Sequence, residues 1–328
     1  MLNKASGSTK KQAVLYGLLF VLIACSGQKA SAEEIWAYLM KGEEKYFPAH
    51  SPITDVACFS ASINADGQLT EGYTTPPALA EKINNMRFHL VITMPWNTTL
   101  AHIYLDPKLP FRQQIINDIK KRSLSFDGIQ IDFESIHAND RDNYLSFLSE
   151  LKQTLPKDKI FSVAVIARWE SHKKKYPNDA FDYHRIGQVA DRVIVMAYDE
   201  HYRSGSPGPI ASLPWCKNVY NYALETIPPE KILMGVPLYG RSWPPKGLSK
   251  SFRNPEIWTD IRKKKVSAMS SAEEGGSYSY STNVTIQVHF ESMPSLNAKM
   301  ALYHSQPIKG IAFWRIGQEP LRFWENIK

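Results

Sequence analysis

The 328-residue chain lacks the features that mark several specialised classes of protein. Its three cysteines are too few for a disulfide-stapled scaffold. Its 43% of hydrophobic residues exceeds what a disordered chain contains, and its mean hydropathy of −0.32 is too low for several membrane spans. A zinc-ligand spacing and a basic helix with interleaved aromatics are also missing, so nucleic-acid binding is not indicated. The composition therefore predicts a globular chain, long enough for one large barrel or two ordinary domains.

Aromatic residues and positive charge are both in excess. Aromatic residues make up 12% of the chain, which suits a sugar-stacking groove as well as a large core. The formal net charge is +7, and much of the surplus lies in two short runs, 173–175 and 262–265. Such runs usually form solvated faces; the alternative is attraction to an anionic polymer or membrane surface outside the cytoplasm.

Residues 1–32 contain a predicted export signal. Lysines at positions 4, 10 and 11 precede an uncharged apolar run, Ala13–Ala24, which is shorter than the roughly 20 residues of a membrane span. Leu22–Cys25 resembles a bacterial lipobox, which predicts removal of residues 1–24 and lipidation of Cys25. The alternative is cleavage after Ala32, at the end of an Ala-Ser-Ala pattern. We therefore expect an extracytoplasmic protein, either a cell-envelope lipoprotein or a secreted or periplasmic one, that meets the membrane only through its lipid.

From residue 35 onward, short β-branched or aromatic runs alternate with amphipathic stretches. This alternation predicts a parallel sheet covered by helices. The predicted strands are Ile35–Met40, Asp55–Ile63, Phe88–Met94, Phe126–Glu134, Ile160–Ala167, Arg192–Tyr198, Ile232–Tyr239 and Gly310–Ile316. Helices are predicted over Phe111–Arg122, Arg141–Leu155, Phe181–Ala190, Leu213–Thr226 and Ser295–Ser305.

Eight such units predict a single (β/α)₈ TIM barrel, an α/β fold, over residues 33–328, because this fold takes about 250 residues plus insertions. The sequence shows no Pro/Gly-rich linker and no internal repeat that would divide the chain. The largest insertion, Ser242–Glu291, falls between the seventh and eighth strands. Its alternating end, Val284–Phe290, predicts an extra strand there.

The fourth predicted strand carries the clearest sign of chemistry. Side chains alternate between the two faces of a strand, so the apolar residues of this segment face the helices while Gln130, Asp132 and Glu134 face the barrel interior. Burying two carboxyl groups and an amide in that interior costs free energy unless they have hydrogen-bond partners or a catalytic or binding role. Glu134 also falls at the C-terminal end of the strand, where barrel enzymes place catalytic residues. A solvated strand end with ordinary ion pairs does not account for this alternation.

This segment resembles the D-G-x-D-x-D-x-E signature of the family 18 glycoside hydrolases, with Gln130 where many relatives have Asp. Three later segments resemble the same family in the same order: Met196–Asp199, Gly235–Trp243 and Gly310–Arg315, at the ends of its sixth, seventh and eighth strands. Four motifs in order are a specific match, whereas any one of them alone is modest. The resemblance implies a TIM barrel with glycosidase activity.

Residues 198–215 resemble one branch of that family, the bacterial spore-germination and cortex-lytic enzymes. These enzymes act on N-acetylglucosamine linkages in peptidoglycan. The resemblance therefore implies cleavage of β-1,4 linkages in N-acetylglucosamine-containing glycans, either peptidoglycan or chitin-type oligomers. LysM wall-binding repeats, which often accompany this branch, are not visible in the sequence.

The family resemblance also implies a mechanism. The 2-acetamido oxygen of the substrate attacks the anomeric carbon, so substrate-assisted retaining catalysis needs a single protein acid. Glu134 is implied as that acid, Asp132 as the residue that orients the acetamido N–H, and Tyr198 as the donor to the acetamido oxygen. The carboxylate of Asp132 is expected to raise the pKa of Glu134, which helps an acid to remain protonated near neutral pH.

The same resemblance implies a set of sugar-binding residues. Asp199 is expected to bond the distorted sugar and Trp314 to stack under its apolar face. Gln130 is expected to hydrogen-bond Asp132 and to keep it ionised over a wider pH range than an Asp would. The remaining candidates are Tyr38, Arg241 and Trp96, the last in a segment that departs from the family pattern.

No metal or cofactor is expected, and we expect a monomer. Glu200 and His201 lack a third ligand at a suitable spacing, so a role in loop structure is favoured. Cys58 and Cys216 could pair only if the fold brings them together. The alternative function is a non-catalytic, chitinase-like glycan-binding protein, against which the retained Glu134 argues. A phosphate or Schiff-base chemistry has no support in the sequence.

Overall fold

The computed structural model describes residues 33–327 except 49, 71, 83–84, 176, 178, 246–248 and 282–283. The expected signal peptide, the lipidation site Cys25 and both cleavage positions lie outside the described residues. Within the described part of the chain, no helix is long and apolar enough to cross a membrane.

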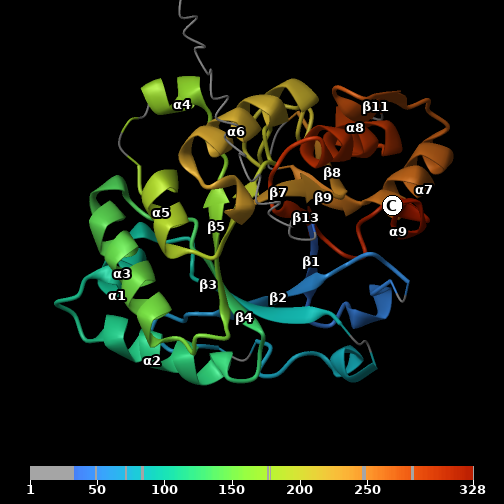
Figure 1. Cartoon of the computed structure of the whole chain (residues 1–328). Coiled ribbons are helices and arrows are strands. Elements are labelled where there is room, and N and C mark those ends of the chain that lie inside the picture. Colours follow the sequence, from blue (N-terminus) through green and yellow to red (C-terminus); the bar gives the residue numbers. More distant parts are fainter. Residues whose placement is uncertain are drawn as a thin grey trace, which may run out of the picture. The chain divides into compact units, whose positions relative to one another are not determined.

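Eight parallel strands close into a barrel, which confirms the predicted fold class (Figure 1). The order around the barrel is β1-β13-β7-β6-β5-β4-β3-β2. Each of these strands overlaps one of the eight predicted ones. They are β1 (Glu34–Met40), β2 (Asp55–Ser62), β3 (Arg87–Thr93), β4 (Gly128–Asp132), β5 (Ile160–Ile166), β6 (Arg192–Met196), β7 (Ile232–Pro237) and β13 (Gly310–Trp314).

Helices cover the outside of the barrel, with α1, α2 and α3 grouped together in Figure 1. The sequence pattern explains their placement: α6 buries residues at 216, 219, 220 and 223, the spacing of one helical face. The helices are α1 (Thr98–Leu105), α2 (Phe111–Ser123), α3 (Arg141–Thr154), α4 (Glu170–Lys175), α5 (Tyr183–Val189), α6 (Leu213–Thr226), α7 (Asn254–Lys264), α8 (Met293–His304) and α9 (Phe323–Asn326). Short 3₁₀ helices are η1 (Glu44–Tyr46), η2 (Ala78–Lys82), η3 (Ala138–Asp140) and η4 (Pro229–Lys231).

The barrel separates two apolar layers, and β4 contributes to both sides as its alternation predicts. Ile129, Ile131 and Phe133 belong to the large core between strands and helices. The barrel interior holds a smaller apolar cluster that includes Trp36, Tyr38 and Leu233. The polar residues of β4 therefore project into an interior that is otherwise largely apolar.

The segment between β7 and β13 forms a small α/β insertion on the barrel. It contains a five-stranded antiparallel sheet in the order β10-β11-β12-β8-β9, together with α7. The strands are β8 (Tyr239–Trp243), β9 (Lys250–Arg253), β10 (Met269–Ser271), β11 (Gly275–Ser281) and β12 (Thr285–Phe290). The predicted extra strand is confirmed as β12. The insertion sheet begins at β8, two residues after β7 ends, and so its first strand starts at the rim of the barrel.

A network of buried charges lies at the N-terminal end of the barrel strands. Glu34 forms ion pairs with Arg87 and Arg192, at 2.8 and 2.7 Å. Asp55 accepts from Arg87 and lies 2.7 Å from the ring of His89. These charges lie at the end of the barrel opposite the usual position of an active site, so we assign them to stability and not to catalysis. Cys58 and Cys216 are both buried and free, so they form no disulfide.

Candidate active site

A pocket of about 390 Å³ opens at the C-terminal ends of the barrel strands. Its lining includes Asp132 from β4, Tyr198 and Asp199 after β6, Arg241 from β8 and Trp314 from β13. Four segments that are far apart in the sequence therefore meet at one place. Glu134, two residues beyond the end of β4, also lines this pocket.

The two carboxyl groups of the β4 segment differ in their access to solvent. Asp132 is buried, whereas Glu134 is exposed through the mouth of the pocket. Burial, followed by the nearby Glu134 carboxylate, raises the pKa of Asp132 to about 8. Desolvation by the surrounding protein, followed by the negative charge of Asp199, raises the pKa of Glu134. The predicted direction for Glu134 is thus confirmed, but the charge that contributes most is Asp199, not Asp132.

Asp132 lacks a partner for one of its oxygen atoms. Its Oδ1 is buried and accepts no hydrogen bond from any described residue. A buried acceptor without a donor is costly, and such groups in native structures call for an explanation. A bound molecule that donates an N–H into the pocket would satisfy this oxygen.

Gln130 and Tyr38 lie beneath the pocket instead of lining it. The Tyr38 hydroxyl donates a 2.6 Å hydrogen bond to Oε1 of Gln130, and Nε2 of Gln130 faces Ser162 at 3.4 Å. Both side chains are buried. The expected hydrogen bond from Gln130 to Asp132 is therefore wrong, because the amide is used by other partners. The pKa of Asp132 is raised while the amide is in place, and whether an Asp at position 130 would raise it further stays a prediction.

Asp199 is fixed on the other side of the pocket by an arginine and a tyrosine. Arg241 donates from Nη2 to both Asp199 oxygens, at 2.9 and 2.7 Å, and from Nε at 3.1 Å. The Tyr239 hydroxyl also donates to Asp199. The backbone of Asp199 has a φ of +58°, a left-handed conformation that is unfavourable for residues other than glycine and is often found at functional sites. The structure thus joins two predicted binding residues, Asp199 and Arg241, into one ion pair.

Two aromatic residues complete the pocket. Trp314 packs edge-on against Phe59, with ring centroids 4.9 Å apart, and tilts against Tyr38 at 5.1 Å. Its half-buried ring therefore has a fixed orientation at the pocket surface. Burial raises the pKa of the Tyr198 hydroxyl well above its usual range, helped by the neighbouring Tyr38 and Asp132. Tyr198 is accordingly a neutral hydrogen-bond donor at every working pH.

Trp96, Glu200 and His201, also named from the sequence, likewise lie outside the pocket lining. Trp96 is 75% exposed, just ahead of α1, and its predicted contact with a neighbouring sugar stays a prediction. Glu200 accepts from the backbone and hydroxyl of Ser212, and His201 lies 2.9 Å from the carbonyl oxygen of Pro209. Glu200 and His201 therefore stabilise the loop after β6, as predicted.

Sequence reasoning missed several pocket residues, among them Arg315, Gln318 and Ser251. Arg315 and Gln318 lie just after β13, and Ser251 lies in β9 of the insertion. Their positions depend on how the loop after β13 and the insertion sheet fold over the barrel. The one available signal was the position of Arg315, directly after Trp314.

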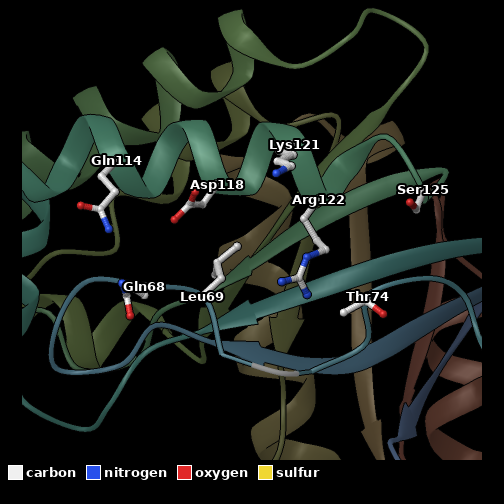
Figure 2. Close-up of a pocket in the computed structure, with 8 residues that line it drawn as sticks. All are labelled: Gln68, Leu69, Thr74, Gln114, Asp118, Lys121, Arg122 and Ser125. Carbon is white, nitrogen blue, oxygen red and sulfur yellow. The ribbon is translucent and has the colours of Figure 1, made fainter.

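A larger hollow of about 580 Å³ lies elsewhere, between α2 and the segment that follows β2 (Figure 2). Its eight lining residues include none of the predicted catalytic residues and no aromatic side chain. It therefore lacks the stacking surface typical of a sugar site. Among the described residues, no group of three or more His, Cys, Asp or Glu side chains is arranged to hold a metal ion.

The site can be compared with known proteins. The chain is 33% identical to "Uncharacterized glycosylase YvbX" of Bacillus subtilis, over 67% of this chain and 65% of that protein. It is 29% identical to the "Cortical fragment-lytic enzyme" of Bacillus anthracis, over 81% of this chain and 65% of that protein. The chain thus spans just under two thirds of the length of these two relatives.

Solved structures have the same barrel. The spore cortex-lytic enzyme SleL of Bacillus cereus superposes with a TM-score of 0.72 at 25% identity, covering 89% of this chain and 73% of that one. The C-terminal domain of a putative chitinase from Desulfitobacterium hafniense DCB-2 gives a TM-score of 0.77 at 25% identity, covering 90% and 97%. The model of one family, described as "Glycosyl hydrolases family 18", matches residues 36–319, a range that contains every residue of the pocket. The chain therefore belongs to the family 18 glycosyl hydrolases.

Proposed function

We propose that this chain is a glycosidase that cleaves β-1,4 linkages following N-acetylglucosamine, with the acetamido group of the sugar as nucleophile and retention of configuration. One observation carries the proposal: among the described pocket carboxyl groups, Glu134 alone is both open to solvent and free of an ion pair. Asp132 is buried with a raised pKa, and Asp199 is held away from this role by its ion pair with Arg241. A mechanism with two protein carboxylates needs a second ionised group at the sugar, and neither of these suits that role.

In the first step, Glu134 donates its proton to the oxygen of the departing sugar. Its raised pKa extends to higher pH the range over which this proton is present. The acetamido oxygen attacks the anomeric carbon as the glycosidic bond breaks, which gives a cyclic oxazolinium ion. The negative charge left on Glu134 lies near this developing cation.

Tyr198 and Asp132 hold the acetamido group in line for that attack. The Tyr198 hydroxyl donates to the acetamido oxygen, and the unpartnered oxygen of Asp132 accepts from the acetamido N–H. Trp314 provides the flat surface under the sugar ring. These contacts replace a diffusional encounter by a fixed geometry, which is a large part of the rate advantage of intramolecular attack.

In the second step, a water molecule attacks the anomeric carbon of the oxazolinium ion. The carboxylate of Glu134 takes a proton from this water, which regenerates both the acid and the acetamido group. Two inversions at one carbon give net retention. Glu134 therefore gives up one proton in the first step and recovers one in the second. This sequence of steps requires no metal or cofactor.

We propose peptidoglycan as the natural substrate class. The support is the similarity to proteins described as cortical fragment-lytic and spore cortex-lytic enzymes, of which this chain spans only part. Chitin-type oligomers contain the same N-acetylglucosamine linkage and are the second candidate. The lipobox-like segment supports a place outside the cytoplasm, as a cell-envelope lipoprotein or a secreted or periplasmic enzyme acting as a monomer.

The test is incubation of the protein with purified peptidoglycan and with chitin oligomers, followed by identification of new reducing ends by mass spectrometry. We expect new ends at N-acetylglucosamine, and loss of at least about a hundredfold in rate for Glu134→Gln with sugar binding kept. Equal rates for Glu134→Gln and the wild type would rule out Glu134 as the acid. Binding without cleavage by the wild type would instead indicate a glycan-binding protein.

A further inference from the structure

The pocket contains a cation that the proposed mechanism does not use. Arg315 follows Trp314 directly, and its side chain is only 16% exposed. Nη1 donates to Glu43 in the segment after β1, and Nε and Nη2 have no partner among the described residues. Because an arginine presents five N–H donors in a planar fork, much of this group remains available to a ligand.

Gln318 lies beside it with an unsatisfied amide. The residue is 6% exposed, it lines the same pocket, and its Oε1 is buried without a hydrogen-bond partner in the described chain. A buried amide oxygen without a donor costs free energy unless a ligand supplies one. Arg315 and Gln318 therefore present donors and one acceptor to whatever binds next to Trp314.

The loop that carries these two residues is held in place before any ligand binds. The Gln318 N–H donates to the carbonyl oxygen of Arg315, and the Gln318 carbonyl oxygen accepts from Asn254 at 3.0 Å. Between them, the carbonyl oxygen of Gly317 accepts from Nε of Arg253 at 2.7 Å. Gly317 has a φ of +83°, a conformation that suits glycine. Because this loop is already ordered, little conformational entropy is lost when a ligand binds to it.

The charge distribution of the pocket indicates what kind of group this site prefers. Asp132, Glu134 and Asp199 are carboxyl groups of the pocket lining, and Arg241 is already committed to Asp199. Arg315 is the other cation of the pocket lining, and its one ion-pair partner in the described part of the chain is Glu43, whose side chain is 30% exposed. A guanidinium fork with two unused nitrogen atoms matches a carboxylate, and the Gln318 amide can bond a neighbouring polar group.

Peptidoglycan and chitin differ in this same chemistry. Every second sugar of a peptidoglycan strand carries a lactyl ether. Its carboxyl group is a free carboxylate where the stem peptide has been removed and is otherwise joined to that peptide by an amide bond, whereas chitin oligomers carry no such group. We propose that Arg315 and Gln318 form a subsite for the lactyl carboxylate of the sugar adjacent to the cleaved N-acetylglucosamine. The inference rests on the proposed function and deepens it, because it assigns the choice between the two glycans to named residues.

The experiment compares three glycans of equal length. The first is a peptide-free strand with free lactyl carboxylates, the second is the same strand with these carboxylates reduced to alcohols, and the third carries stem peptides on its lactyl groups. We expect Arg315→Gln to raise KM for the first glycan about tenfold, the loss of one charge-assisted hydrogen bond, and to leave KM for the second within about twofold. Arg315→Lys should fall between, because it keeps the charge and loses the fork.

Glu43→Gln should change KM in the opposite direction from Arg315→Gln. Without its partner, Arg315 should bind the carboxylate more tightly, so KM for the first glycan falls while KM for the reduced glycan stays unchanged. Arg185→Gln is the matched control: it also removes one arginine with an acidic partner, Asp142, but lies on α5. It should change KM for neither glycan. This pair of variants keeps the proposal testable even if Arg315→Gln folds poorly.

Two results would overturn the proposal: equal effects of Arg315→Gln on the free and the reduced glycan, or an effect confined to the peptide-bearing glycan. The second result would assign the carboxylate to the stem peptide. Cleavage of none of the three glycans by the wild type would contradict the proposed function instead. Binding of the first two glycans to Glu134→Gln, with and without Arg315→Gln, then decides whether Arg315 discriminates between them.

Discussion

The Tyr38 hydroxyl donates a 2.6 Å hydrogen bond to Oε1 of Gln130, directly below the carboxyl groups of the pocket. This contact occupies the oxygen of the one residue in the β4 motif that departs from the family pattern. Asp132, two residues further along the same interior face, is left with an oxygen that has no partner. The proton equilibrium of the site therefore depends on Asp132, Glu134 and Asp199, without a further inner carboxylate.

Gln130→Asp should change the pH dependence of activity and not abolish it. A carboxylate at this position would place another negative charge near Asp132 and raise the pKa of Asp132 further. The same charge would also disfavour loss of the proton from Glu134, so the alkaline limb of the kcat profile should move to higher pH. The measurement is a pH–rate profile of both proteins on one N-acetylglucosamine oligomer. Superimposable profiles would show that position 130 has no influence on the proton equilibrium.

Asp132→Asn should make the protein more stable at pH 8 while it loses activity. The folded protein keeps the Asp132 proton up to about pH 8, whereas the unfolded chain releases it near pH 4. The wild type therefore loses stability as pH rises through this window, and a neutral amide avoids the loss.

Urea unfolding of both proteins at pH 5 and pH 8 measures this difference. The advantage of Asp132→Asn in the free energy of unfolding should be small at pH 5 and at least about 1 kcal/mol larger at pH 8. A constant difference across this range would mean that Asp132 does not titrate as described.

Asp199→Asn should lower the pKa of Glu134. Asp199 is the charge that contributes most to the raised pKa of Glu134, so its removal favours loss of the proton from the acid. The alkaline limb of the activity profile should move to lower pH, and kcat/KM should fall about tenfold or more because Arg241 and Tyr239 lose their partner. An unchanged limb would indicate that Asp132, the neighbour expected from the sequence, sets the pKa instead.

The sequence predicted the barrel because its signals are local and repeated. The apolar residues of β4 alternate with Gln130, Asp132 and Glu134, and that period of two determines which side chains face the interior. The insertion strand β12 was predicted in the same way, from alternation. These patterns depend on neighbouring residues in the chain and need no knowledge of the closed barrel.

The contacts between segments could not be predicted in this way. The Arg241–Asp199 ion pair joins β8 to the loop after β6, and the Tyr38–Gln130 hydrogen bond crosses the barrel interior. Arg315 and Gln318 enter the pocket because Arg253 and Asn254 of the insertion hold their loop. Such contacts depend on register and loop packing, which residue spacing does not encode.

The most direct measurement compares a glycan in its N-acetylated form with the same glycan after removal of the acetyl groups. Wild-type protein should cleave the acetylated form and lose at least about a thousandfold in rate on the other, because the attacking oxygen is absent. Cleavage of the deacetylated glycan at a comparable rate would contradict the account, since the nucleophile would then have to come from the protein or from water.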